Sequence, residues 1–96
     1  MLDYLCLYTM EVLKEAGAET RGTGMTISDI LDYRPKSVKE DEIYSAPYKR
    51  LTLTRKIKSL LDEGYIDYGI MYRQAKSYYI TTKGVKELNE INGKKS

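Results

Sequence analysis

The chain has 96 residues, a net charge of +2 at neutral pH, ten tyrosines and no histidine, phenylalanine or tryptophan. This length predicts one domain with one modest core. The absence of histidine removes the commonest general base and metal ligand, and the single cysteine, Cys6, forms neither an internal disulfide nor a zinc site. The sequence contains no catalytic constellation, so we expect a protein that is not an enzyme and holds no cofactor or metal.

The sequence also predicts where the protein resides. No apolar run approaches the roughly 20 residues that span a bilayer. The first residues include Asp3 and lack the basic start and long apolar core of a signal peptide. We therefore expect a cytoplasmic protein with no membrane partner, in which Cys6 is a buried structural thiol.

Charge is unevenly distributed along the chain. Residues 1–32 contain two basic and six acidic residues, residues 33–46 contain three of each, and residues 47–96 contain eleven basic and five acidic residues. A surface that binds nucleic acid must be positive, because it neutralises phosphates. The second half of the chain is where we expect such a surface.

Two helices are predicted in the first third of the chain. Apolar residues recur at helical spacing over residues 2–16, and Gly17 follows as the expected helix end. After a glycine-rich loop, a short helix is expected to begin at Thr26 or Ser28. Pro35 ends it near Tyr33, because the residue before a proline is pushed away from helical angles.

The longest helix is predicted over residues 48–63. Ser45 or Ala46 is expected to cap it, with Pro47 in its first turn and Gly64 at its end. Its apolar residues share one helical face. These are Leu53, Ile57, Leu60 and Leu61.

A β-hairpin and a last helix are predicted next. Two runs rich in strand formers, 65–71 and 77–81, flank a polar and basic segment, 72–76. The last helix is predicted from Thr81 or Thr82 to Ile91. This order of elements is that of a winged helix-turn-helix, an α+β and mostly helical fold with a two-stranded wing and a C-terminal helix.

We assign the whole chain to a single winged-helix domain over residues 1–92, followed by a frayed basic tail over 93–96. We find no internal repeat and no low-complexity tract.

Two motifs resemble those of the MarR and PadR types of bacterial transcription regulators. The segment from Leu60 to Gly64 and Ile66 is similar to their Leu-x-x-x-Gly-hydrophobic-Ile pattern, where the recognition helix meets the first wing strand. Ile80-Thr81-Thr82-Lys83-Gly84 resembles their Leu-Thr-x-Lys-Gly signature after the second wing strand. The resemblance implies a DNA-binding helix followed by a wing.

The sequence departs from a simple helix-turn-helix before the basic helix. Fourteen residues, 34–47, separate the short helix from the basic one, whereas a simple motif has a turn of three or four residues. Ser37 and Glu40 have the spacing of a capping box, which predicts one or two helical turns over 37–44. Either this segment is the true second helix of the motif, or it is an insertion.

The basic helix is the candidate for reading DNA. Five basic residues and no acidic one lie between Pro47 and Ser59. An α-helix fits the major groove, where Arg and Lys donate to guanine and Thr bonds either way. We expect the first half of the helix to reach the bases more than Lys58 does, and Thr52, Arg55, Lys56 and Ser59 to face outward. The candidate residues on this helix are Lys49, Arg50, Thr52, Thr54, Arg55, Lys56 and Lys58.

The hairpin tip is the second candidate contact. Arg73, Gln74 and Lys76 lie there, and a basic wing commonly enters the minor groove or follows phosphates. Tyr44, Tyr48 and Tyr72 are expected either to bond phosphates or to pack in the core.

The leading interpretation is a homodimeric regulator that binds double-stranded DNA, with its dimer interface on the first and last helices. Candidates for that interface are Leu2, Leu5, Tyr8, Val12, Leu88 and Ile91. The second interpretation is a plasmid or phage partition or replication adaptor that binds DNA, because small winged-helix proteins such as those of the TubR type also serve in this role. A third interpretation is a winged helix that binds an acidic protein.

Overall fold

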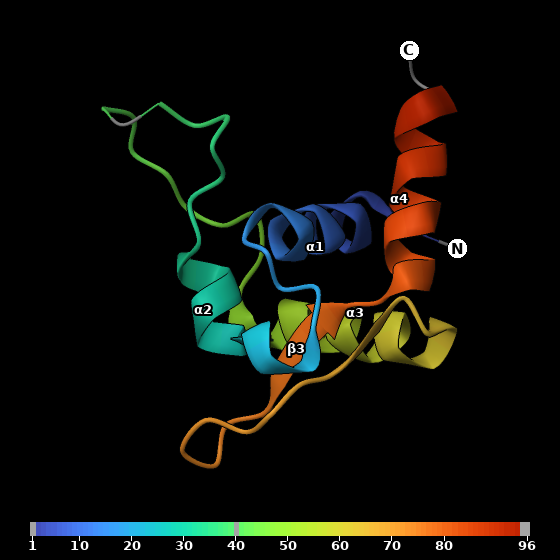
Figure 1. The fold of residues 1–96 in the computed structure, drawn as a ribbon. Coiled ribbons are helices and arrows are strands. Elements are labelled where there is room, and N and C mark those ends of the chain that lie inside the picture. The colour runs from blue at the N-terminus through green and yellow to red at the C-terminus, as the bar shows by residue number, and fades with distance from the viewer. Residues whose placement is uncertain (1, 40, 95–96) are drawn as a thin grey trace.

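The computed structural model describes residues 2–39 and 41–94. The elements follow one another as α1 (Tyr4–Glu15), η1 (Arg21–Thr23), β1 (Met25–Thr26), α2 (Ile27–Asp32), α3 (Arg50–Glu63), β2 (Ile66–Tyr68), β3 (Ser77–Ile80) and α4 (Thr82–Lys94). α1 and α3 lie one above the other, α4 stands across their ends, and the hairpin projects away from the body (Figure 1). This is the α+β winged helix-turn-helix predicted from the sequence.

The core forms where the helices meet the sheet. α1 packs on α3 and α4, and α2 packs on α3. The predicted inner face of α3 is confirmed, because Leu53, Ile57 and Leu60 are all buried. Cys6 is buried as well, and burial raises the pKa of its thiol.

The sheet has one strand more than the sequence predicted. β2 and β3 form the expected antiparallel hairpin, although β2 ends at Tyr68 and not at residue 71 as predicted. β1 pairs with the other edge of β3, with Met25 opposite Tyr78. A strand of two residues has no alternation of its own to detect, so only its partner defines it.

The expectation of a helix over 37–44 is wrong. In its described parts, 37–39 and 41–44, the chain forms isolated turns and no helix, with the Val38 amide donating to the Pro35 carbonyl and the Glu42 amide to the Lys39 carbonyl. Ile43 is fully exposed, so the segment lacks the buried apolar stripe that stabilises a short helix. α2 is therefore the second helix of the motif, and the long connection to α3 is an insertion, seen at upper left in Figure 1.

The start of α3 also differs from the prediction. Its N-cap is Lys49, not Ser45 or Ala46, so Pro47 lies outside the helix. Tyr48 is buried, and its hydroxyl lies 2.8 Å from the Thr9 hydroxyl. This contact keeps the residues before Lys49 from continuing the helix. The other end is as predicted, since Gly64 adopts the left-handed conformation with φ 77°.

α4 continues to Lys94, beyond the predicted end at Ile91. Part of the predicted tail is therefore helical, and residues 95–96 lie outside the described residues. At the start of α4, Gly84 packs directly on the carbonyl of Tyr65, so a side chain there would overlap it.

Asp3 joins α1 to α3 through two bonds of one carboxylate. One oxygen accepts from the Cys6 amide at 2.8 Å, which caps α1, and the other lies 2.6 Å from the Lys56 ammonium. The Lys56 bond, followed by the Cys6 amide, lowers the pKa of Asp3 from 3.8 to about 2. The cap and the ion pair together fix the start of α1 against the middle of α3.

This lowered pKa predicts an acid-sensitive contribution to stability. An unfolded Asp3 binds a proton at higher pH than the folded one, so the contribution is present above pH 4 and is lost as pH falls toward 2. Asp3→Asn keeps the cap but removes the charge, and should lower the free energy of unfolding at pH 7 by about 0.5 kcal/mol, since the pair is partly exposed. Urea titrations at several pH values should show the difference from wild type closing at pH 2. A difference that persists at pH 2 would contradict this assignment.

Candidate nucleic-acid interface

The two flanks of α3 face different parts of the molecule. On one flank, Lys56 turns toward α1 and binds Asp3. On the other, the guanidinium of Arg50 donates to the hydroxyl of Ser28 at 2.6 Å, at the start of α2. The second flank faces the wing.

The starts of α2 and α3 and the wing enclose a groove of about 380 Å³. It brings together three residues predicted to contact DNA, Arg50, Gln74 and Lys76, from segments more than 20 residues apart. Thr26 and Ser28 line its α2 side. The Thr26 hydroxyl accepts from the Asp29 amide at 3.1 Å, so it caps α2.

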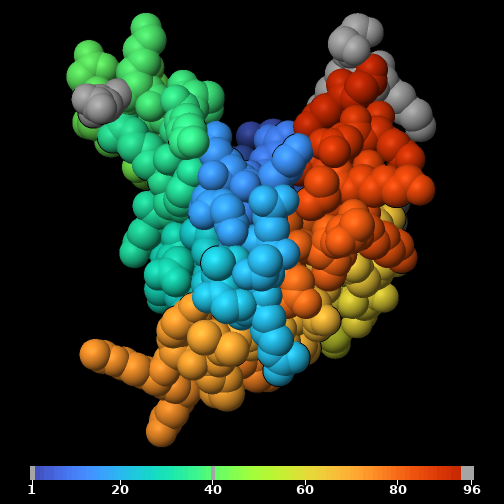
Figure 2. Space-filling model, in the orientation of Figure 1, coloured from blue at the N-terminus to red at the C-terminus, as the bar shows by residue number. Residues whose placement is uncertain are grey.

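The wing ends in a tight two-residue turn. Tyr72 and Ala75 exchange backbone hydrogen bonds of 2.9 and 2.8 Å, and Arg73 and Gln74 have φ angles of 48° and 71°. Positive φ at both central residues defines the turn whose twist suits a hairpin, although glycine or asparagine is usual there. Both side chains are exposed, and the wing projects beyond the body of the protein (Figure 2, lower left).

The base of the wing is fixed by hydrogen bonds. The hydroxyl of Ser77, which is fully buried, donates to the carbonyl of Ile70 at 2.6 Å. The Ile70 amide donates to the Arg21 carbonyl at 3.1 Å. The Lys76 ammonium lies 5.4 Å from the centre of the Tyr68 ring, which holds this side chain along the stem. These contacts join the two strands of the wing at its base and attach the base to η1.

The predicted residues of α3 divide by exposure. Lys49, Arg50, Thr54, Arg55 and Lys58 are exposed, and the Thr54 hydroxyl donates to the Arg50 carbonyl at 2.8 Å. Lys56 is half-buried and bound to Asp3, and Thr52 is half-buried as well, so neither is exposed as the predicted outward face required. A local pattern cannot show which flank a neighbouring helix covers.

One residue on this surface was missed. Leu51 is 64% exposed in the first turn of α3, directly after Arg50 and four residues before Arg55. The helical repeat predicts this exposure. Leu51 lies about 200° around the helix from the buried Leu53, so the two side chains point in nearly opposite directions.

The three tyrosines considered for phosphate contacts have different environments. Tyr48 is buried, and burial raises its pKa to about 12. Tyr44 is half-buried, and the Tyr72 hydroxyl donates to the Gly22 carbonyl at 3.2 Å. Of the three, Tyr48 belongs to the core.

The residues proposed for a dimer interface also differ in how deeply they are buried. Val12 and Leu88 are buried within one chain, so they are not available to a partner. Leu2, Leu5, Tyr8 and Ile91 are half-buried.

The fold and the groove define a winged-helix protein. The starts of α2 and α3 and the wing border its groove, to which Arg50 and Lys76 contribute positive charge. A solved structure from Ralstonia eutropha JMP134, of a protein provisionally named as DNA-binding, is similar to this chain. The TM-score is 0.64 with 20% sequence identity, over 95% of this chain and 98% of that chain. This likeness establishes the shared fold. No family model and no curated protein matches the chain, so the resemblance to the MarR, PadR and TubR types stays a prediction.

Two other kinds of site are absent from the described residues. Across residues 2–39 and 41–94, no helix has the length and apolarity to cross a bilayer. In the same ranges, no three side chains of the types His, Cys, Asp or Glu are grouped to hold a metal ion.

Proposed function

We propose that this protein binds double-stranded DNA, with the start of α3 in the major groove and the wing on the minor groove or the phosphates. The observation that carries the proposal is the groove in which Arg50, Gln74 and Lys76 meet. Arg50 and Lys76 are cations that suit phosphates and guanine edges, and Gln74 can bond adenine.

The exposed half of α3 supports the same proposal. Arg55 lies opposite the buried face of the helix, and Leu51 presents an apolar side chain of the kind that contacts thymine methyl groups. The acidic residues Asp62 and Glu63 lie at the far end of the helix. The positive charge is thus concentrated at the end that faces α2 and the wing.

A homodimeric transcription regulator is the form of this function that we favour. Half-buried apolar residues beside α1 and on α4, Leu2 and Ile91 among them, are available to a second copy. A two-fold dimer binds an inverted repeat with half-sites about one helical turn apart. The name of the Ralstonia eutropha protein, which has the same fold, supports DNA binding in general.

Salt dependence tests the proposal. Six exposed cations lie on α3 and the wing: Lys49, Arg50, Arg55, Lys58, Arg73 and Lys76. If each contacts a phosphate, the logarithm of the binding constant should fall with the logarithm of salt concentration with a slope of about −5 per protomer. Anisotropy titrations on fragments selected from the source genome measure this slope. A slope near zero would refute the proposal.

The selected fragments also distinguish the roles. A lone inverted repeat supports a regulator, whereas clustered direct repeats support a partition adaptor.

A further inference from the structure

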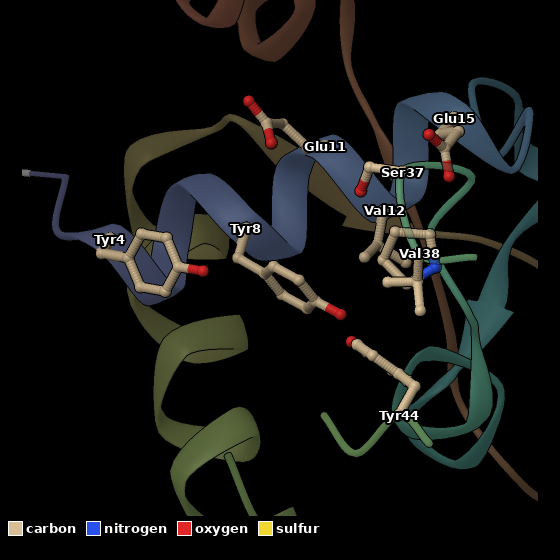
Figure 3. Close-up of a pocket in the computed structure, with 9 residues that line it drawn as sticks. Tyr4, Tyr8, Glu11, Val12, Glu15, Ser37, Val38 and Tyr44 are labelled. Atoms are coloured by element: carbon tan, nitrogen blue, oxygen red, sulfur yellow. The ribbon is translucent and has the colours of Figure 1, made fainter. Parts of the chain in front are cut away.

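A second concave site lies between α1 and the insertion that precedes α3. It measures about 310 Å³, the lower end of the range for small-molecule pockets. Tyr4, Tyr8 and Val12 line it from α1, and Val38 and Tyr44 line it from the insertion (Figure 3).

Two phenol groups in this pocket are buried and unsatisfied. Within the described residues, neither the Tyr8 nor the Tyr44 hydroxyl has a hydrogen-bond partner. The two hydroxyls point toward one another across the cavity (Figure 3). Buried polar atoms without partners are rare, and each calls for an explanation. A tyrosine hydroxyl holds its proton at neutral pH and can donate, and burial raises the pKa of Tyr44 further.

The rim of the pocket is acidic. Glu11 and Glu15 line it, and no lysine or arginine does so among the described residues. One oxygen of Glu15 accepts from the Tyr33 hydroxyl at 2.8 Å and from the Lys36 amide at 3.0 Å. In the described part of the chain, Glu11 makes no hydrogen bond or ion pair.

From this lining we infer that the pocket binds a small organic cation, an ammonium group that carries a short polar or apolar body. The faces of tyrosine rings attract such cations, and a carboxylate at the rim adds to the attraction. The facing hydroxyls of Tyr8 and Tyr44 suit a hydroxyl or carbonyl on the body of the ligand. An anion would be repelled by Glu11 and would find no basic partner.

The pocket is linked to the start of α3. The Tyr8 ring packs edge-on against Tyr48, with ring centres 5.6 Å apart and an interplanar angle of 83°. Tyr48 directly precedes Lys49, the N-cap of α3. A ligand that displaces Tyr8 therefore shifts the end of α3 that is proposed to reach DNA. This consequence, unlike the site itself, rests on the proposed function.

Choline and its neutral isostere, 3,3-dimethylbutan-1-ol, test the site without DNA. In a ¹⁵N NMR titration, choline should shift the amides of Tyr8, Val12 and Val38. The isostere has the same shape without the charge and should bind about tenfold more weakly. Equal affinity for the two probes, or no saturable shift with millimolar choline, would overturn the inference.

Matched variants sharpen this test. Glu11→Gln should weaken choline binding about three- to tenfold, whereas Glu19→Gln, an exposed acidic residue outside the pocket, should leave it unchanged. Tyr44→Leu should reduce the preference for choline over the isostere, because one of the three tyrosine rings that line the pocket is lost. The same spectra report whether each variant folds. Folded variants that both bind choline as wild type does would refute the site.

The link to α3 has a separate readout. Saturating choline should change the affinity for a selected DNA fragment in wild type but not in Glu11→Gln. If choline binds and the DNA affinity stays the same, the link is wrong while the site stands. If no DNA fragment is bound at all, the proposed function fails and the NMR titration still decides the site.

Discussion

Replacing Arg55 with alanine should weaken binding of a selected DNA fragment about tenfold, whereas Lys56→Ala should change it less than about twofold. The two residues are neighbours on α3, and each variant removes one positive charge. Arg55 is exposed on the outer face of the helix, and Lys56 is half-buried against Asp3. Fluorescence anisotropy at one fixed salt concentration measures both affinities.

Comparing the two variants distinguishes the effect of where a side chain lies on α3 from the effect of the net charge of the chain. If the DNA lay along the α1 side of α3, the effects of the two variants would be reversed. Equal losses would mean that the total charge of the chain determines affinity, and that α3 has no defined orientation on DNA. Denaturation curves of both variants provide the control, since Lys56→Ala also removes a contact to α1.

The second large effect concerns stability. Gly84→Ala should lower the free energy of unfolding by about 2–3 kcal/mol, because an added methyl group overpacks a site that cannot relax. A Cβ there meets the Tyr65 backbone and lies 2.7 Å from Cγ1 of Ile80, which is completely buried. For a domain of this size, the melting temperature should fall by about 10–20 °C.

Gly93→Ala is the matched control on the same helix. A Cβ at Gly93 meets nothing within 4 Å, so alanine should be neutral or stabilising by up to about 1 kcal/mol. Thermal unfolding followed by circular dichroism measures both variants. A Gly84→Ala protein as stable as wild type would mean that α4 does not pack closely on the start of β2.

The packing of Gly84 gives a physical reason for one of the two sequence motifs. Thr81 begins the turn into α4, where its hydroxyl donates to the Gly64 carbonyl at 2.8 Å and accepts from the Gly84 amide at 3.1 Å. The Lys83 ammonium donates to the Glu63 carbonyl at 2.7 Å. These residues join the end of α3 to the start of α4, with the wing between them in the sequence. The residues of this motif therefore form the hydrogen bonds that hold the two ends of the wing together at its base.

Local patterns account for much of the fold. The repeat of Leu53, Ile57 and Leu60 defines the inner face of α3, and Gly64 ends the helix because it adopts positive φ readily. The alternation and polarity of 65–81 predict the hairpin in its observed place. Such features depend on residues a few positions apart, which is why the sequence shows them.

The insertion marks the limit of that reasoning. A capping-box spacing at Ser37 and Glu40 favoured a helix, but the surrounding residues supply no continuous apolar stripe for the body of the protein. Tyr44 and Val38 instead face the α1 pocket, and Tyr48 anchors the end of the segment. The strand β1 was missed for a similar reason, since its partner β3 lies about 50 residues further along the chain.

By itself, then, the sequence determined the order of the helices and the wing, the inner face of α3, and the concentration of positive charge in the second half of the chain. The tertiary structure decided which flank of α3 faces the wing, because the Lys56–Asp3 pair joins residues 53 positions apart. It also brought Arg50 to Gln74 and Lys76, and Tyr8 to Tyr44. Contacts between distant residues depend on how the whole chain packs, and no local spacing encodes them.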